Sequence, residues 1–284
     1  MTSKQRVVAA LNHRQPDQVP MDFGGTAVTG MHVQAVAALR RHYGLEERPV
    51  KVVEPYQMLG GVDEDLATAM GLDIAGITPR NTIFGFANEN WREWRAPFGQ
   101  TLLVSGNFRT TNDANGDLLI YPAGDTSAPP SGRMPVGGYF FDTIVRQEPI
   151  VDDELNVEDN LEEFGPIGDA DLAHLAAEAR RVAATGRGVI ATFGGTAFGD
   201  IALVPAPFLR RPRGIRDIAE WYMSTVVRKE YVHAIFERQC EIALANLARI
   251  KAAVGDVVDA VPMPPPMPSS MALPSGSVGW DAPG

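Results

Sequence analysis

Cysteine is nearly absent from this sequence, which contains only Cys240. One thiol cannot close an internal disulfide and cannot hold a zinc ion by itself, so a disulfide framework and a cysteine-rich zinc site are both excluded. The chain also lacks an apolar run of about 18 residues, and we therefore expect no membrane span. Residues 1–6 lack the apolar stretch and cleavage site of a signal peptide, so we expect a cytoplasmic protein.

Basic residues are in the minority, with 25 Lys and Arg against 35 Asp and Glu and a net charge of −10. This balance argues against a nucleic-acid-binding protein, which needs a basic face to neutralise phosphates. Lysine is scarce, so the basic residues are mostly arginines, which suit a carboxylate or phosphate ligand. Codon bias in a GC-rich genome is the simpler explanation. The 45% of hydrophobic residues are enough for a sizeable core in a chain of 284 residues.

The first part of the chain alternates short apolar segments with amphipathic ones. Ser3 can cap a first helix, which ends before Pro16. The pattern then predicts strands over 19–23, 49–53 and 72–77, and helices over 31–43 and 63–70. Strand, polar turn, helix and strand in this order are typical of parallel βα units.

The middle of the chain, about residues 91–146, has a different pattern. Short alternating segments at 101–104, 118–121 and 139–141 are separated by turn residues, and 113–117 is a strong hairpin turn. We interpret this stretch as an antiparallel meander inserted between βα units.

The βα pattern returns at residue 169 and stops at residue 261. It predicts helices over 169–185, 215–223 and 230–254, and strands over 189–193 and 257–261. The inward candidates of the last helix are Ile235, Ile242, Leu244, Leu247 and Ile250. Residues 262–284 are rich in Pro, Gly and Ser, so we expect a disordered or polyproline-like tail, with a Pro-rich ligand for a partner domain as the alternative.

Several segments, in the right order, resemble the uroporphyrinogen decarboxylase superfamily, which includes the methylcobamide:coenzyme M and other corrinoid-linked methyltransferases. The matching segments are Ala9–Pro20, Gly71–Ile74, Asn160–Pro166, Val189–Gly195 and Ala253–Asp259. The resemblance implies a (β/α)8 TIM-type barrel, whose sites lie at the carboxyl ends of the strands. Without the insertion at about 91–146 and the tail at 262–284, the chain has residues for about half of such a barrel. The expected fold class is therefore α/β, an incomplete barrel over 1–261 carrying the antiparallel insertion.

The decarboxylase itself fits poorly at the positions that matter. Its first strand carries an arginine-containing segment that grips the carboxylates of the tetrapyrrole, whereas residues 21–29 contain Asp22 and no arginine. An octacarboxylate would be repelled there. Residues 193–198 match only part of a second decarboxylase motif, and its tyrosine position falls near Leu203. The resemblance therefore favours the corrinoid methyltransferase side, with uroporphyrinogen III decarboxylation as the enzymatic alternative.

The methyltransferase branch resembles a zinc enzyme that uses a His-x-Cys pair and a later Cys to hold a thiol substrate as thiolate. This chain has no such ligands, so we expect no cofactor in it and assign zinc and a corrinoid partner to the intact relative. Cys240 lies in a predicted amphipathic helix, where we expect a buried, inert thiol.

The loss of pattern at Pro262 has two further interpretations. The chain is a truncated or frame-shifted product of a longer gene and inactive as it stands, or it is a non-catalytic fragment that binds a partner. An open barrel leaves strand edges unpaired, so we expect a homo-oligomer to cover them. Neither a nucleic acid nor a membrane is an expected partner; the expected one is a small molecule or a corrinoid protein.

Candidate site residues follow predicted strands. Asp22 is a candidate general base or ligand anchor, or else caps the following helix. Arg80 is the second candidate for catalysis, or else forms a surface salt bridge. The candidates for substrate binding are Glu54, Asn81, Gly194, Gly195, Thr196 and Asp200; the glycines would let a ligand approach the backbone at a helix start.

Overall fold

Two parallel strands, β4 (Ile74–Ile77) and β11 (Gly188–Ala191), organise one half of the molecule. The computed structural model describes residues 1–161, 165–193, 201 and 203–261. Ala260 forms a parallel bridge with Ile190 on the far side of β11. On the other side of β4, the Asp73 amide donates to the Met21 carbonyl over 2.9 Å. Residues 19–23, β4, β11 and residues 257–261 thus lie side by side.

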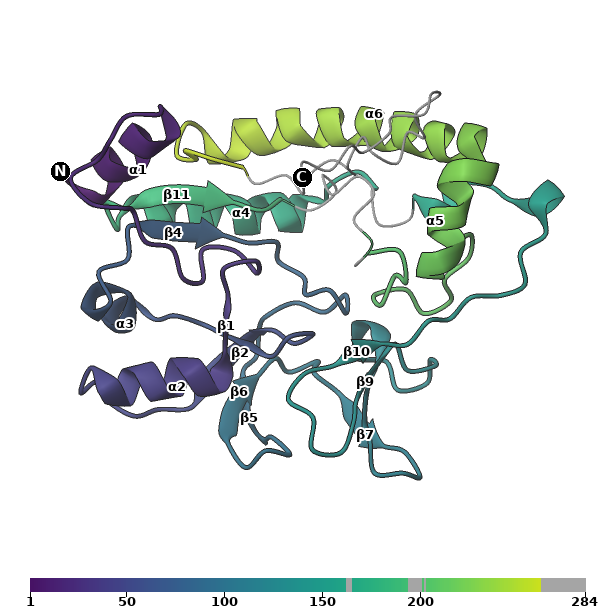
Figure 1. Ribbon diagram of the computed structural model, residues 1–284, viewed down its shortest axis with the longest axis horizontal. Coiled ribbons are helices and arrows are strands. Elements are labelled where there is room, and N and C mark those ends of the chain that lie inside the picture. The colour runs from purple at the N-terminus through teal and green to yellow at the C-terminus, as the bar shows by residue number, and fades with distance from the viewer. Residues whose placement is uncertain (162–164, 194–200, 202, 262–284) are drawn as a thin grey trace, which may run out of the picture.

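Helices cover this parallel group, as the upper half of Figure 1 shows. Helix α4 (Asp169–Ala183) packs against β4 and α6 (Lys229–Val254), and α1 (Ser3–Leu11) packs against β4 and β11. The buried core between them contains Ile77, Leu175, Ala179, Val182, Val189, Ala191, Phe193, Ile250 and Val254.

The other half holds two further sheets. The first has five strands in the order β1 (Met31–His32), β3 (Leu59–Gly60), β2 (Val50–Glu54), β6 (Thr101–Val104) and β5 (Arg92–Arg95). Helix α2 (Val33–His42) packs against it, and α3 (Glu64–Ala69) leads into β4. The second has the order β10 (Asp142–Thr143), β9 (Gly132–Met134), β8 (Leu118–Ile120) and β7 (Thr110–Asn112).

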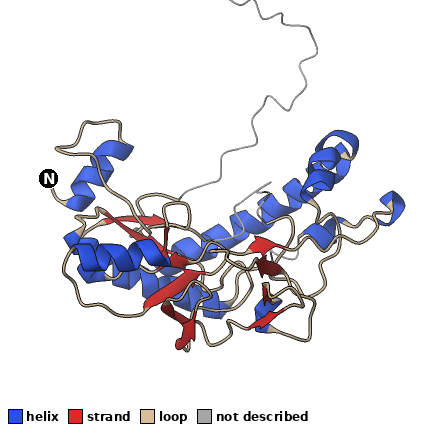
Figure 2. Ribbon diagram, turned by 60° about the horizontal axis from the view of Figure 1, so that its bottom comes forward, coloured by secondary structure: helices blue, strands red, loops and turns tan. Residues whose placement is uncertain are grey.

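These two sheets share one core, in which Phe108 contacts Phe86, Trp94 and Phe141 edge to face. The short 3-10 helix η1 (Pro122–Gly124) connects β8 to β9, and η2 (Asp152–Glu154) and η3 (Val157–Asn160) follow β10 in the chain. Helix α5 (Ile218–Val227) packs on α6 around Trp221 and Ile235. In the turned view the strands gather toward the centre, with helices around them (Figure 2).

Most predicted helices are confirmed, but the first helix is capped differently. Thr2, not Ser3, is the cap: its hydroxyl accepts from the Gln5 amide, and the Gln5 side chain accepts from the Thr2 amide. Ser3 is already helical, and its hydroxyl faces the Asp73 carboxylate.

Three predicted strands are wrong as strands. Residues 19–23 lie beside β4, and residues 257–261 lie beside β11. Individual backbone hydrogen bonds and the Ile190–Ala260 bridge hold them there, but neither segment forms a continuous ladder. At 139–141 the chain is irregular, because Phe141 is buried and its amide donates to the Tyr56 carbonyl; the strand is β10, just beyond.

The predicted strand at 49–53 exists as β2, but it does not join the parallel group. It pairs antiparallel with β3 and parallel with β6, so it belongs to the sheet that includes part of the predicted insertion. No closed cylinder is formed by the strands within the described ranges. The incomplete barrel stays a prediction, and the tail at 262–284 lies outside the described residues.

Candidate functional site

Asp22 holds together a loop that lies along β4. Its Oδ1 accepts from the Gly25 amide over 2.9 Å, and its Oδ2 accepts from the Thr29 hydroxyl over 3.0 Å. A further bond from the Gly24 amide to the Thr29 carbonyl closes the loop. The half-buried carboxylate therefore fixes the conformation of residues 22–29, and each of its oxygens keeps acceptor capacity for a ligand.

The loop sits directly on the backbone of β4, and glycines permit the approach. A Cβ added to Gly76 would lie 1.9 Å from the Gly25 carbonyl oxygen. A Cβ on Gly25 would lie 2.6 Å from Asp22 Oδ1 and 3.0 Å from Ile74 Cγ2. The Gly24-Gly25 pair, with Gly24 at φ +89°, thus serves to seat the loop and to aim Asp22.

Arg80 follows β4 by three residues and is already paired. Its Nη2 lies 3.3 Å from Glu89 Oε2, and its side chain is 34% exposed. Asn81 is exposed and forms an antiparallel bridge with Ala87. The surface salt bridge, which was the alternative for Arg80, is therefore present, although the half-exposed guanidinium keeps further donors for an anion.

Glu54 lies elsewhere, at the end of β2 in the five-stranded sheet. Its carboxylate accepts from the backbone amides of Tyr56 and Gln57, over 2.9 and 2.8 Å. Burial raises the pKa of the carboxyl, and the two amide bonds oppose that shift only in part. Glu54 organises the turn before β3 and does not join the parallel strands.

The structure therefore brings Asp22 and Arg80 to one strand, β4, and separates Glu54 from them. No hydrogen bond or ion pair joins Asp22, Glu54, Arg80 and Asn81 to one another, all four being in the part of the chain that the structure describes. The other four candidates, Gly194, Gly195, Thr196 and Asp200, lie outside the described residues.

Asp73, a buried carboxylate directly before β4, was not among the predicted site residues. Asp73 is 1% exposed; it accepts from Arg6 Nη1 over 2.6 Å and from the Met21 amide over 3.0 Å. Burial alone would raise the pKa of this carboxyl, but the bonds from Ser3, Met21 and Arg6 outweigh it and hold the pKa below its ordinary value. Asp73 belongs to the Gly71–Ile74 match, which was the available signal.

Two further arginines, the partly buried Arg146 and the fully buried Arg216, were not among the predicted site residues. Arg146 donates to the carbonyls of Leu209 and Ala206, over 2.6 and 2.8 Å, and burial together with the charge of Arg216 lowers its pKa to about 10. Arg216 is fully buried and donates to three backbone carbonyls, those of Arg213, Val204 and Asp159. Both guanidiniums brace irregular backbone.

The zinc that the resemblance implies finds no donor set here. In the described ranges, no three His, Cys, Asp or Glu side chains gather as metal ligands would. Cys240 is exposed, so the predicted buried thiol is wrong: it lies on the outer side of α6, where Gln239 and Ile235 face inward. Of the described helices, none has both the length and the apolar character needed to cross a membrane.

No protein-family model, no curated protein and no solved structure matches this chain. The family assignment therefore rests on the sequence motifs and remains a proposal.

Proposed function

We propose that this chain belongs to the uroporphyrinogen decarboxylase superfamily, on its corrinoid-linked methyltransferase side. In its intact form the protein would transfer a methyl group between a corrinoid and a small acceptor. The chain itself would supply the first βα units of an incomplete barrel and the surface on which the acceptor or the corrinoid rests.

The observation that carries the proposal is the charge of the loop beside β4. The loop presents the Asp22 carboxylate, and the guanidinium that follows the same strand, Arg80, is already paired with Glu89. An octacarboxylate needs several unpaired cations at this position. A corrinoid, whose periphery carries amides rather than carboxylates, does not.

The contacts of Arg146 and Arg216 support the same choice. Both guanidiniums donate to backbone carbonyls, those of residues 159, 204, 206, 209 and 213, and stabilise the backbone at these positions. Redirecting either guanidinium to a substrate would leave buried carbonyls without donors, at a cost of about 1–3 kcal/mol for each one.

Within the proposed reaction, the described residues bind and orient. Asp22, fixed by Gly25 and Thr29, would accept a hydrogen bond from an acceptor hydroxyl or from a corrinoid amide. The described residues provide no donor set for zinc.

Two alternatives have an observation in their favour. Arg80 follows the parallel strand β4 and is partly exposed, and a guanidinium suits a carboxylate substrate, so uroporphyrinogen III decarboxylation remains the enzymatic alternative. The second alternative, a non-catalytic fragment or binding protein, is favoured by the missing metal donors in the described ranges.

Equilibrium titration of the purified chain with methylcobalamin and with uroporphyrin III separates these functions. We expect the cobalamin to bind at least about tenfold more tightly, a difference of about 1.4 kcal/mol. Asp22→Arg should narrow the gap by improving uroporphyrin binding, whereas Glu47→Arg, at an exposed position on the surface, is the control. Tighter uroporphyrin binding, with carbon dioxide released from uroporphyrinogen and lost in Arg80→Gln, would favour the decarboxylase; binding of neither probe would favour the fragment.

A further inference from the structure

The hairpin that joins β7 to β8 carries a reactive pair of residues at its tip, Asn115 and Gly116. No other asparagine of the sequence is followed by glycine. The backbone nitrogen that follows an asparagine can attack its side-chain carbonyl carbon, and a glycine there has no Cβ to hinder the approach. Both residues are exposed, so water reaches the reacting atoms. None of the candidate site residues described above lies in this hairpin.

Three hydrogen bonds hold the peptide that would react. The Gly116 amide donates to the Asp113 carbonyl over 3.1 Å, and the Gly116 carbonyl accepts from Asn112 Nδ2 over 3.1 Å. The Asn115 amide donates to Asp113 Oδ1 over 2.8 Å. While the turn is closed, the attacking nitrogen is therefore engaged by the Asp113 carbonyl, and both sides of the peptide are fixed.

We propose that Asn115 is a site of spontaneous deamidation, and that local opening of the turn at 113–117 controls its rate. In the open turn the Gly116 nitrogen bonds to Asn115 Cγ, its proton passes through solvent to the side-chain nitrogen, and that nitrogen leaves as ammonia. Water then adds to either carbonyl of the cyclic imide and opens the ring, which yields aspartate or isoaspartate. The sequence of steps consumes only water. The inference is independent of the proposed function.

The isoaspartate product changes the backbone of the hairpin. It adds one carbon to the main chain before Gly116, inside a turn that the Asp113 amide closes with a 3.0 Å bond to the Asp117 carbonyl. The longer turn no longer matches this closure. Asp117 Oδ1 also accepts from the Val136 amide over 2.9 Å, so the disturbance reaches the segment that follows β9. We therefore expect the isoaspartate form to melt at a lower temperature than the parent chain.

Asn112 is the internal control for the site. It is exposed on the same hairpin, but it is followed by Asp113, whose Cβ hinders the same attack. Incubation of the full-length chain at mildly alkaline pH, followed by peptide mapping with mass spectrometry, measures both positions in one sample. We expect Asn115 to be converted at least about tenfold faster than Asn112. Equal rates at the two positions would overturn the site.

Variants of the turn test whether its opening controls the reaction. Asn112→Ala removes the bond to the Gly116 carbonyl and should speed conversion of Asn115 by about two- to tenfold, which is the effect of one hydrogen bond on a local opening. Asp113→Ala removes the side-chain acceptor of two amides and should speed it further. Ala114→Ser is the matched control, because it changes an exposed residue of the same turn and removes none of these bonds.

A distant variant separates local opening from global unfolding. Gly76→Ala lies on β4, far along the chain from the hairpin, and introduces a clash with the Gly25 carbonyl oxygen. If the turn opens locally, this variant should leave the rate at Asn115 unchanged, and urea-unfolded chain should react faster than folded chain. A rate that is the same in the parent, Asn112→Ala and Asp113→Ala, or that rises in Gly76→Ala, would overturn the control by the turn.

Discussion

Replacing Gly76 with alanine tests how closely the Asp22 loop is seated on β4. The added methyl carbon would lie 1.9 Å from the Gly25 carbonyl oxygen, 2.7 Å from its carbonyl carbon and 2.9 Å from its Cα. Non-bonded heavy atoms settle at about 3.5 Å, so the loop would have to move away by more than about 1 Å. The clash is with backbone, and no side-chain rotation relieves it.

The expected cost follows from this geometry. Overpacking a filled site costs about 1–3 kcal/mol, and we place Gly76→Ala at the upper end because two backbones must separate. The backbone angles of Gly76 are ordinary, so alanine adopts them without strain and slightly favours the folded state by restricting the unfolded chain. A measured loss therefore reports the clash alone.

Urea unfolding, followed by circular dichroism, measures the free energy of unfolding for both variants. The matched control is Gly165→Ala, because a Cβ at Gly165 meets no atom within 4 Å. We expect this control to stay within about 0.5 kcal/mol of the parent chain. If Gly76→Ala were as stable as Gly165→Ala, the close seating of the loop on β4 would be wrong.

Four further predictions concern charged groups. Arg40, 2% exposed and bidentate to Asp65, should cost about 2–3 kcal/mol when changed to Met, a loss seen in urea unfolding. The hydrogen bond from Arg40 lowers the pKa of Asp65 to about 2. This carboxyl therefore stabilises the fold above pH 4, and its contribution is lost as the pH falls through about 2. Asp65→Asn should reduce the loss of stability over that acidic range. Asp73→Asn should likewise lower stability near neutral pH and reduce its loss in acid, because the folded pKa is depressed. Glu54 has the opposite sign, because its pKa is raised by burial. The contribution of this carboxyl to stability is greatest below pH 4 and is lost as the pH rises through the folded pKa, so Glu54→Gln should remove this part of the dependence from a pH series of melting temperatures.

Helix ends were predictable because their signals are local. Gly44, Gly71, Gly186 and Gly255 each follow a predicted helix, and each has a positive φ between 65° and 69°. This conformation is one that glycine adopts without penalty, so the residue type alone indicates where a helix stops. The same local information did not distinguish Thr2 from Ser3 as the first cap.

Strand pairing was less predictable because it is a long-range property. The apolar residues of Val50–Glu54 predict a strand, and β2 forms there, but nothing in its five residues specifies β3 and β6 as neighbours instead of β4. The sequence likewise places Asp22 and Glu54 after apolar segments, without showing that their own turn amides would bind both carboxylates. Candidate residues are thus found more readily than the geometry that decides their role.

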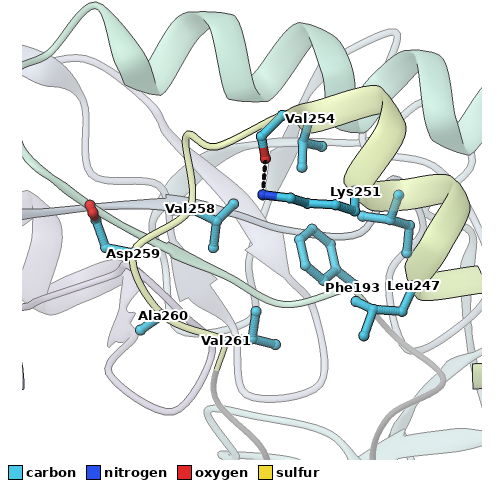
Figure 3. A pocket seen from close by; sticks show the side chains of 10 residues that line it. Phe193, Leu247, Lys251, Val254, Val258, Asp259, Ala260 and Val261 are labelled. Carbon is cyan, nitrogen blue, oxygen red and sulfur yellow. Dashed lines mark hydrogen bonds between the residues drawn. The ribbon is translucent and has the colours of Figure 1, made fainter. Parts of the chain in front are cut away.

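The hydrophobic stripe of helix α6 is wider than the helix surface that is buried in the structure. Leu244 and Leu247 were predicted to face inward with Ile250, but they are 63% and 42% exposed, whereas Ile250 is 3% exposed. A hydrophobic stripe reports which face evolved to be buried, not which partner buries it. Leu247 lines an apolar groove beside β11 together with Phe193 and Val258 (Figure 3). Leu244 lies outside the groove, so its exposure needs a different contact; a melting temperature that rises with protein concentration in the parent but not in Leu244→Gln would identify that contact as a second copy.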